Sequence, residues 1–361
     1  MEGPSGTTVT LNGKKYLYFA GTSYFNLHRH PGLIKSAAAA LEQYGLGSAT
    51  SRTLSGTTPA ILELERLAAS FFGTEDAVYL PSGYLSNLAG FDGLMQYHPF
   101  HRIYVDEYAH YSLCDAARAT GKPVCEFGHL NADDLQQLLE ETLKPGDRPL
   151  VASDGLFPVS GKMPPAARYL EIVGRYGGVL WLDDAHGSGI TGASGRGTAE
   201  ELGLENRNLF TGTTLSKAFG AYGGVVSGNA SFIAKVRRSG AYQGSNAPLS
   251  AAVAAGIKGM ELVRSNPGLR KALREKAFTL KQGLAAIGLP VTPDDIPIAS
   301  FTWGDAKGMI GLRQKLLEEG IYIQYTSYRG SGPEGALRMV VCSDHSRQEI
   351  DRLIEVLGHA L

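Results

Sequence analysis

The sequence predicts an α/β protein in which helices cover both faces of a mainly parallel sheet, followed by a smaller α+β domain. Helical patterns alternate with short apolar strand patterns over most of the chain, and long helical patterns dominate after about residue 250. The chain has 361 residues, 43% of them hydrophobic, which is enough for two compact domains. We expect an N-terminal segment at 1–35 that associates with the small domain, a large domain at 36–250 and the small domain at 251–361.

Capping residues and apolar periodicity predict the individual elements. Thr58 and Pro59 begin a helix that Gly73 ends, and Asn131 caps a second helix at 132–143. Further helices are predicted at 169–176, 251–264 and 267–287, and from a capping box at Ser346 and Glu349 onwards. Short apolar runs between turns predict strands at 77–80, 149–153, 178–183, 208–213, 223–227 and 298–303.

The composition limits the kind of partner. Lys plus Arg (34) and Asp plus Glu (35) nearly cancel, so no strong field would attract nucleic acid or an acidic membrane, and we expect a small-molecule substrate. The three cysteines are widely spaced without a C-x-x-C pair, which indicates reduced thiols in a cytoplasmic protein rather than disulfides or a metal site. No signal-peptide pattern and no run near ~18 apolar residues occurs, so we expect neither export nor a membrane span.

The strongest local signal is Lys217, in a turn of small residues between two predicted strands. A buried amine loses its proton more easily and can then act as a nucleophile that forms an imine. The hydroxyls of Thr214 and Ser216 could bind a phosphate, and the glycines that follow would let a flat ring approach the backbone. Taken alone, such a lysine is more often a solvated surface residue.

Carboxylates and an imidazole follow the predicted strand at 178–183, at the edge where α/β sheets bind ligands. Asp183 could pair with a protonated pyridine nitrogen, which keeps the ring of a bound cofactor an electron sink. His186 could then reach the ring hydroxyl. The alternative is a capped turn that binds no ligand.

Ser82, Gly83 and Tyr84 follow the strand at 77–80 and begin a helical pattern, so their free backbone N–H groups form a candidate phosphate cradle. An ordinary strand-to-helix turn is the alternative. The cradle, the carboxylate and the lysine occur in an order that a single sheet could bring together. Together they predict pyridoxal 5'-phosphate as the cofactor.

Two further residues are candidates with a competing structural explanation. His110 could stack on the ring face, although a lone histidine is more often structural. Arg338 lies on an apolar strand pattern, where a buried guanidinium needs a carboxylate partner. That partner could be the carboxylate of a substrate or one within the protein.

Taken in order, these residues resemble the α-oxoamine synthase family of fold-type I pyridoxal-phosphate enzymes, and among them the 8-amino-7-oxononanoate synthases most. The similarity runs from about Tyr16 to the C-terminus, and its most specific pieces are 183–187 with 195–197, and 214–220. The resemblance implies a seven-stranded sheet in the large domain and a homodimer with shared active sites.

The resemblance also implies a role for each candidate. Lys217 forms the Schiff base and later carries the proton, Asp183 pairs with the ring nitrogen, His186 contacts the ring hydroxyl and His110 stacks. The phosphate would be bound by Ser82, Gly83, Tyr84 and Thr214, together with Ser245 from the neighbouring subunit. Arg338 would bind the substrate carboxylate, with Thr22 beside the substrate.

The implied reaction joins an amino acid to an acyl thioester, from acyl-CoA or an acyl carrier, with loss of the thiol and carbon dioxide to give an α-amino ketone. Two alternatives remain open. One is pyridoxal-phosphate chemistry without a thioester, such as transamination or aldol-type cleavage, and the other is a catalytically silent scaffold.

The sequence departs from the family pattern at several positions. A usual asparagine is Thr22, a usual histidine is Ile61 and a usual serine is Pro158; a glycine pair is Ala49 and Thr50, and a proline-containing stretch is replaced by residues 326–329, ending in Arg329. Most of these departures fall on the acyl and thioester side and leave the imine-forming residues intact.

Overall fold

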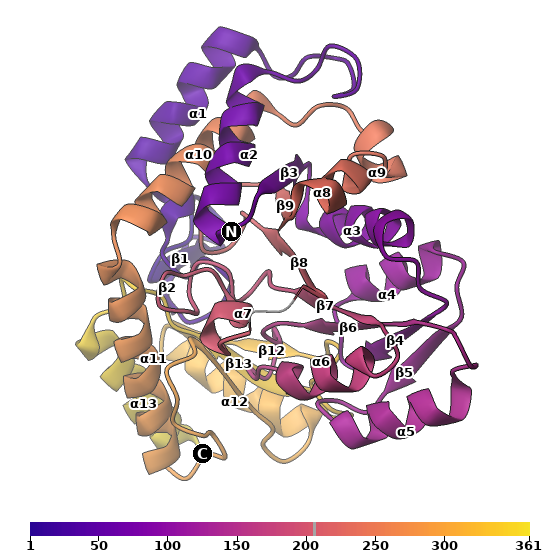
Figure 1. Ribbon diagram of the computed structural model, residues 1–361. Coiled ribbons are helices and arrows are strands. Elements are labelled where there is room, and N and C mark those ends of the chain that lie inside the picture. Colours follow the sequence, from indigo (N-terminus) through magenta and orange to yellow (C-terminus); the bar gives the residue numbers. More distant parts are fainter. Residues whose placement is uncertain (205–206) are drawn as a thin grey trace. The chain divides into compact units, whose positions relative to one another are not determined.

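The computed structural model describes residues 1–204 and 207–361, and the chain divides into two compact units. The larger unit consists of Pro31–Leu156 and Met163–Ser265, and the smaller of Met1–His30, Phe157–Lys162 and Asn266–Leu361 (Figure 1). Helix α10 (Ser250–Ser265) belongs to the larger unit. The domain limits expected at residues 35 and 250 stay a prediction.

The larger unit is built on a seven-stranded sheet, as the family resemblance implies. Its strands in spatial order are β3 (Asp76–Leu80), β9 (Gly224–Gly228), β8 (Leu209–Thr214), β7 (Val179–Asp183), β6 (Pro149–Asp154), β4 (Arg102–Asp106) and β5 (Val124–Phe127). The neighbours from β8 to β5 are parallel, whereas β9 runs antiparallel to β8 and β3. The segments that follow β6, β7 and β8 therefore lie at one edge of the sheet.

Alternate side chains of the sheet face two layers of helices, which Figure 1 shows on its two sides. On β7, Val179 and Trp181 pack in one core, and Leu180 and Leu182 pack in the other. The first layer contains α3 (Gly83–Tyr97), α4 (Tyr111–Ala119) and α8 (Ala230–Val236), and the second contains α5 (Ala132–Thr142) and α6 (Ala166–Gly174). Burial on both faces explains why these strands are continuous apolar runs in the sequence.

The predicted helix signals are found in the structure. Thr58 Oγ1 accepts a hydrogen bond from Ile61 N–H at the start of α2 (Pro59–Phe72), and Gly73 ends the helix with a φ of 69°. Helix α6 begins at Ala166 rather than at 169, directly after two prolines. The other helices of this unit are α1 (Pro31–Tyr44), α7 (Thr198–Glu201) and α9 (Gly240–Gln243).

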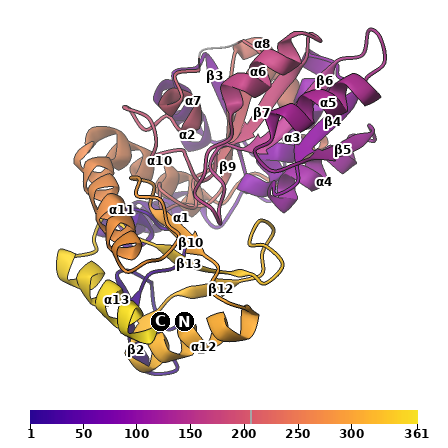
Figure 2. The ribbon, with the colours of Figure 1, turned by 90° about the horizontal axis from the view of Figure 1, so that it is seen from below.

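The smaller unit contains two three-stranded sheets among its described residues. One consists of β1 (Thr8–Leu11), β2 (Lys14–Tyr18) and β11 (Ile321–Tyr322), and the other of β10 (Ile298–Phe301), β13 (Ala336–Val340) and β12 (Gln324–Thr326); a 3-10 turn, η1, spans Leu27–Arg29. Helices α11 (Gly268–Ala286), α12 (Ala306–Glu318) and α13 (Arg347–Ala360) pack with β10 and β13 in one core (Figure 2). Ser346 and Glu349 form the predicted capping box of α13. In the described part of the chain, no helix has the length and apolarity to cross a membrane.

Candidate active site

The predicted site residues of the larger unit meet at the carboxyl edge of its sheet. Strands β6, β7 and β8 end there at Asp154, Asp183 and Thr214. The pocket at this edge is lined by Ser82, Gly83, Tyr84, His110, Ser112, Asp154, Asp183, Ala185, His186, Thr214, Ser216, Lys217, Tyr222 and Gly223. It brings together every predicted catalytic residue and every predicted cofactor residue except Ser245.

Lys217 lies half-buried in the turn that joins β8 to β9. Leu215 N–H donates to Gly223 O across this turn at 2.9 Å. Burial lowers the pKa of His110 and the Lys217 charge lowers it further, whereas burial raises the pKa of Asp154 and the Lys217 charge opposes that rise. Lys217 lines the same pocket as His110 and Asp154, so a solvated surface position does not describe this side chain.

Asp183 ends β7 with its carboxylate held by two donors. Asn87 Nδ2 donates to Oδ2 at 2.6 Å, and the backbone N–H of Ala185 donates to Oδ1 at 3.0 Å. The side chain is 7% exposed and faces the pocket. A carboxylate oxygen has two acceptor positions, so Asp183 can still accept a hydrogen bond from a protonated ring nitrogen.

His110 precedes α4 and caps it. Its ring Nδ1 accepts a hydrogen bond from Ser112 N–H at 3.1 Å, and its own backbone N–H donates to Asp154 Oδ2 at 2.8 Å. Burial is the main cause that lowers the pKa of His110, and Asp183 acts against it. A neutral imidazole beside Asp183 fits the flat stacking partner that the sequence predicts.

The residues at the start of α3 have the geometry that a phosphate site requires. Ser82 Oγ accepts from Leu85 N–H, so the amides of Gly83 and Tyr84 are the first-turn donors without an intrahelical acceptor. A Cβ on Gly83 would lie 2.7 Å from Thr214 Cβ, and one on Gly224 would collide with Ser86 Oγ. The close approach of three segments therefore depends on these glycines, and it leaves helix N–H groups directed at the pocket, as phosphate binding requires.

Thr214 and Ser216 share a hydrogen-bond network at the end of β8. Thr214 Oγ1 donates to Gly223 O and accepts from Ser216 N–H, and the two hydroxyl oxygens are 2.9 Å apart. Because the Thr214 proton is directed to a carbonyl, the exposed Ser216 hydroxyl is the more available donor for a phosphate.

Three residues that the sequence did not single out contribute to the site. Asp154 lines the pocket, and Asn87 and Ser112 bind Asp183 and His110. Asp154 follows the strand predicted at 149–153, so the rule that selected Asp183, an acid at the carboxyl end of a buried strand, could have found it.

Ser245 does not line the pocket of its own chain. It follows α9, and its hydroxyl donates to Ala241 O at 2.6 Å. The neighbouring Asn246 forms a β-bridge with Ser51 in the loop before α2, which places this surface segment beside that loop.

Thr22 and Arg338 belong to the smaller unit. The Arg338 guanidinium is buried, and its Nε and Nη1 donate to Pro158 O at 2.6 Å and to Gly21 O at 3.3 Å. Burial lowers the pKa of Arg338. Its partners among the described residues are backbone carbonyl oxygens. Arg338 therefore forms no salt bridge with a carboxylate of the described residues, and that alternative is wrong for them.

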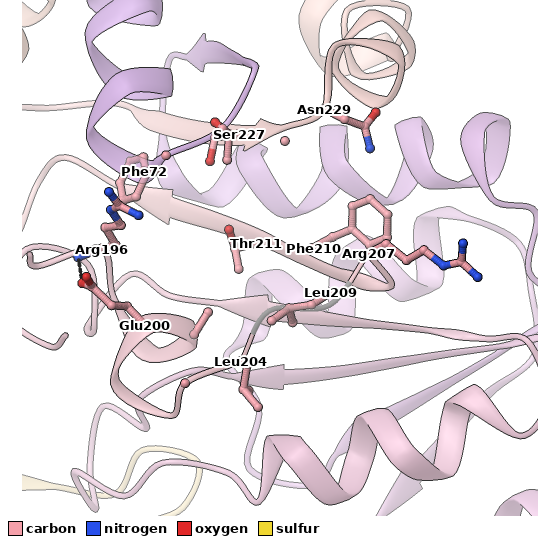
Figure 3. Close-up of a pocket in the computed structure, with 15 residues that line it drawn as sticks. Phe72, Arg196, Glu200, Leu204, Arg207, Leu209, Phe210, Thr211, Ser227 and Asn229 are labelled. Atoms are coloured by element: carbon pink, nitrogen blue, oxygen red, sulfur yellow. Dashed lines mark hydrogen bonds between the residues drawn. The ribbon is translucent and has the colours of Figure 1, made fainter. Parts of the chain in front are cut away.

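A second cavity lies in the larger unit and contains none of the residues of the candidate site (Figure 3). It measures about 720 Å³ and lies where β8 begins and β9 ends, next to Phe72, Arg196 and Glu200. None of the predicted catalytic or cofactor residues lines it. Figure 3 shows Arg207 directed away from Arg196, so the two guanidinium groups do not converge on one ligand.

The fold and the site together define an α/β enzyme with a lysine and a carboxylate at the carboxyl edge of a mainly parallel sheet. Residues 20–357 match the family described as Aminotransferase class I and II, and the chain belongs to that family.

Individual relatives agree with this family. The chain is 32% identical to a putative 8-amino-7-oxononanoate synthase from Desulforudis audaxviator, over 99% of this chain and 93% of that protein. It is 31% identical to an 8-amino-7-oxononanoate synthase from Alkaliphilus metalliredigens, over 99% of this chain and 90% of that protein. A solved structure of SPT with PLP internal aldimine matches with a TM-score of 0.92 and 25% identity, over 100% of this chain and 90% of that one. The resemblance predicted from the sequence is confirmed.

Proposed function

We propose that this chain is a pyridoxal-phosphate-dependent acyltransferase of the α-oxoamine synthase type, which condenses an amino acid with an acyl thioester. The observation that carries the proposal is that Lys217, Asp183, His186 and the start of α3 line one and the same pocket. The full-length relatives named 8-amino-7-oxononanoate synthase support the acyl-transfer reaction.

The pocket residues divide the binding of pyridoxal 5'-phosphate among them. The amides of Gly83 and Tyr84, with the hydroxyls of Ser82 and Ser216, bind the phosphate, and Thr214 joins them by turning its hydroxyl proton from Gly223 O to the phosphate. Asp183 accepts a hydrogen bond from the protonated ring nitrogen, His186 contacts the ring hydroxyl and His110 packs on the ring face. When bound, the cofactor supplies an electron sink for the charge left on the amino acid.

The chain's own residues act on the substrates. Arg338 binds the carboxylate of the amino acid, with Thr22 beside it, and Lys217 Nζ removes the proton from Cα. The Cα then bonds to the thioester carbonyl carbon, the thiolate leaves, and carbon dioxide leaves from the carboxylate. Lys217 returns the proton to the same carbon, which gives the α-amino ketone.

Thiol release is the direct test of this function. Cofactor-loaded protein is incubated with each amino acid and a panel of acyl-CoA and acyl-carrier donors, and the free thiol is measured. We expect release that requires both substrates and falls at least roughly 10³-fold in Lys217→Ala, with borohydride fixing the cofactor to Lys217 in the unaltered protein. Lys258→Ala, which removes a half-buried lysine of α10 that does not line the pocket, is the control.

Two outcomes would contradict the proposal. One is the absence of thiol release with every substrate pair. The other is conversion of an amino acid to a keto acid without an acyl donor, which would favour transamination.

The proposal includes a homodimer in which Ser245 completes the phosphate site of the neighbouring subunit. Three leucines on the loops around the Ser51–Asn246 bridge are largely exposed: Leu46 is 76%, Leu54 80% and Leu249 55% exposed. Apolar side chains gathered on one surface are typical of an interface. A second copy of this chain would cover them and bring Ser245 to the other pocket.

Mixing two inactive variants tests this arrangement. Lys217→Ala and Ser245→Trp are each expected to lose activity, whereas a mixed dimer contains one pocket with neither change and recovers part of it. Leu54→Asp is expected to give a monomer by light scattering. An active monomer of unaltered sequence would contradict the shared site. We place the enzyme in the cytoplasm, because its three cysteines are free thiols.

A further inference from the structure

Asn87 is a buried polar side chain at the centre of the larger unit, and the proposed function assigns it no role. It lies on α3 with 1% of its surface exposed, facing the ends of β7 and α4. Both ends of its amide form hydrogen bonds to side chains that are distant in the sequence. A buried amide with every partner fixed is a rigid part of a structure.

Trp181 determines which way this amide points. The indole Nε1–H can only donate, and it donates to Asn87 Oδ1 at 2.8 Å, so Nδ2 must lie on the opposite side. Trp181 is itself fixed, because its ring contacts the Cα atoms of two glycines: a Cβ on Gly212 would lie 2.7 Å from the ring, and one on Gly90 would overlap it. The amide cannot turn over without leaving the indole unsatisfied.

The two protons of Asn87 Nδ2 are used at two site residues. One bond goes to Asp183 Oδ2 at 2.6 Å and the other to Ser112 Oγ at 2.8 Å. With Ala185 N–H on Oδ1, the carboxylate of Asp183 is held at both oxygens, which fixes its plane. The direction in which Asp183 faces the pocket therefore depends on Asn87.

Ser112 extends the same chain of donors to His110. The backbone N–H of Ser112 donates to His110 Nδ1, so this nitrogen is an acceptor. The Oγ of Ser112 lies 2.7 Å from the same nitrogen. Since Oγ accepts from Asn87, its proton is directed to Nδ1. In the neutral ring the proton must then lie on Nε2.

We infer that Asn87 is a positioning residue that orients the carboxylate of Asp183 and, by directing the Ser112 hydroxyl proton, supplies the second hydrogen bond to Nδ1 of His110. The inference rests on the proposed function of this site, because it concerns how two of its residues face the cofactor. Neither effect requires Asn87 to touch the cofactor or the substrate.

The histidine tautomer can be measured without the cofactor. In cofactor-free protein with ¹⁵N-labelled histidine, long-range ¹H–¹⁵N spectra report which ring nitrogen carries the proton, and His110→Gln assigns the signal. We expect Nδ1 of His110 to be unprotonated in the unaltered protein. Asn87→Leu and Ser112→Ala are both expected to shift the Nδ1 signal, because Nδ1 then accepts from the backbone N–H of Ser112 without the directed hydroxyl proton.

Cofactor affinity distinguishes the effect of Asn87 on Asp183 from its effect on Ser112 and His110. Asn87→Leu removes the donor to Asp183 and is expected to raise the Kd for pyridoxal 5'-phosphate about tenfold, the effect of one lost buried hydrogen bond to a charged group. Ser112→Ala leaves that donor in place, so its Kd should change less than about threefold. Asn87→Asp, which keeps the acceptor for Trp181, replaces Asn87→Leu if the latter does not fold.

Asn229→Ala is the matched control. It removes the side-chain cap of α8 and its bond to Tyr97, so it should lower stability without moving the His110 signal. The inference is overturned if Asn87→Leu and Asn87→Asp leave the His110 signal unchanged, or if Asn229→Ala shifts it equally. Failure of the unaltered protein to bind the cofactor would count against the proposed function alone, because the histidine spectra still decide the role of Asn87.

Discussion

Asp154 and Asp183 are paired across the adjacent parallel strands β6 and β7, so two carboxyl groups end side by side at the pocket. Their environments differ. Asp154 accepts a hydrogen bond from His110 N–H, and burial, followed by the charge of Asp183, raises the pKa of Asp154 well above its ordinary value. Asp183 instead accepts from two fixed donors. We therefore expect Asp154 to be protonated. Asp183, in contrast, is expected to accept the hydrogen bond from the ring nitrogen.

Replacing each acid by its amide tests this division. Asp154→Asn keeps a neutral group with an oxygen for His110 N–H, so cofactor affinity and kcat should change less than about threefold. Asp183→Asn removes the charge opposite the ring nitrogen, and kcat should fall roughly 10²- to 10³-fold. Cofactor titration and thiol release measure both variants. Equal losses in the two variants would show that Asp154 acts as an anion.

The glycine at the start of α3 gives a second prediction. Gly83→Ala places a methyl group 2.7 Å from Thr214 Cβ, so α3 and the end of β8 must separate. Since overpacking costs about 1–3 kcal/mol, we expect cofactor affinity to fall roughly tenfold or more. Gly311→Ala in α12, where a Cβ meets nothing within 4 Å, is the control and should raise the free energy of unfolding by about 0.5–1 kcal/mol. Unchanged affinity in Gly83→Ala would exclude the cradle at this position.

Local signals explain how much of the fold could be predicted. The helix after Thr58 and the capping box at Ser346 are encoded within a few residues, and the structure has both. The direction of β9 is different, because its residues are buried on both faces and carry the same apolar pattern in either direction. Its antiparallel pairing with β8 follows from the short connection at 215–223, which contains Lys217 and has no periodic pattern.

The candidate site shows the same limit. Lys217, Asp183 and Ser82 could be predicted because each lies where a strand ends, a position that the sequence pattern marks. Asn87 could not, because its partners Trp181 and Asp183 are 94 and 96 residues away along the chain. An asparagine inside a helix has no sequence signal that distinguishes a buried network from a solvated face.

The buried ion pair of Glu65 and Arg52 gives a prediction about stability. Glu65 accepts from Arg52 Nη1 at 2.5 Å, from Nη2 at 3.1 Å and from Tyr79 N–H at 2.8 Å. Glu65→Gln leaves the Arg52 guanidinium buried without its full counter-charge, which should lower the free energy of unfolding by about 3–5 kcal/mol. Chemical denaturation measures this value.

Glu171→Gln is the control for that experiment. Glu171 also binds two arginines, Arg168 and Arg175, but its carboxylate lies on the exposed face of α6. Solvent screens such pairs, so the substitution should leave unfolding almost unchanged. If both variants unfold alike, burial of the Glu65 pair contributes nothing to stability.

The last prediction concerns acid stability and His345. Its ring stacks on Phe19 at 4.3 Å, its Nδ1 accepts from Cys342 N–H at 3.0 Å, and its Nε2 lies 3.1 Å from Tyr18 O. Burial lowers the pKa of His345 from 6.5 to about 4. Between these two values the unfolded chain binds a proton that the folded protein does not. The stabilisation is therefore complete above pH 6.5 and is lost as the pH falls toward 4.

His345→Gln should remove this pH dependence. The pKa shift of His345 corresponds to at most about 3 kcal/mol. Between pH 4 and pH 7, the free energy of unfolding of the unaltered protein should therefore rise by up to this amount more than that of the variant. Asp184 acts with the opposite sign, because burial raises its pKa from 3.8 to about 7 and the folded state holds the proton in that window. Only the difference between variant and unaltered protein isolates His345. His359→Gln, an exposed histidine in the last turn of α13, should keep the full pH dependence, and an equal loss in both variants would contradict the assignment.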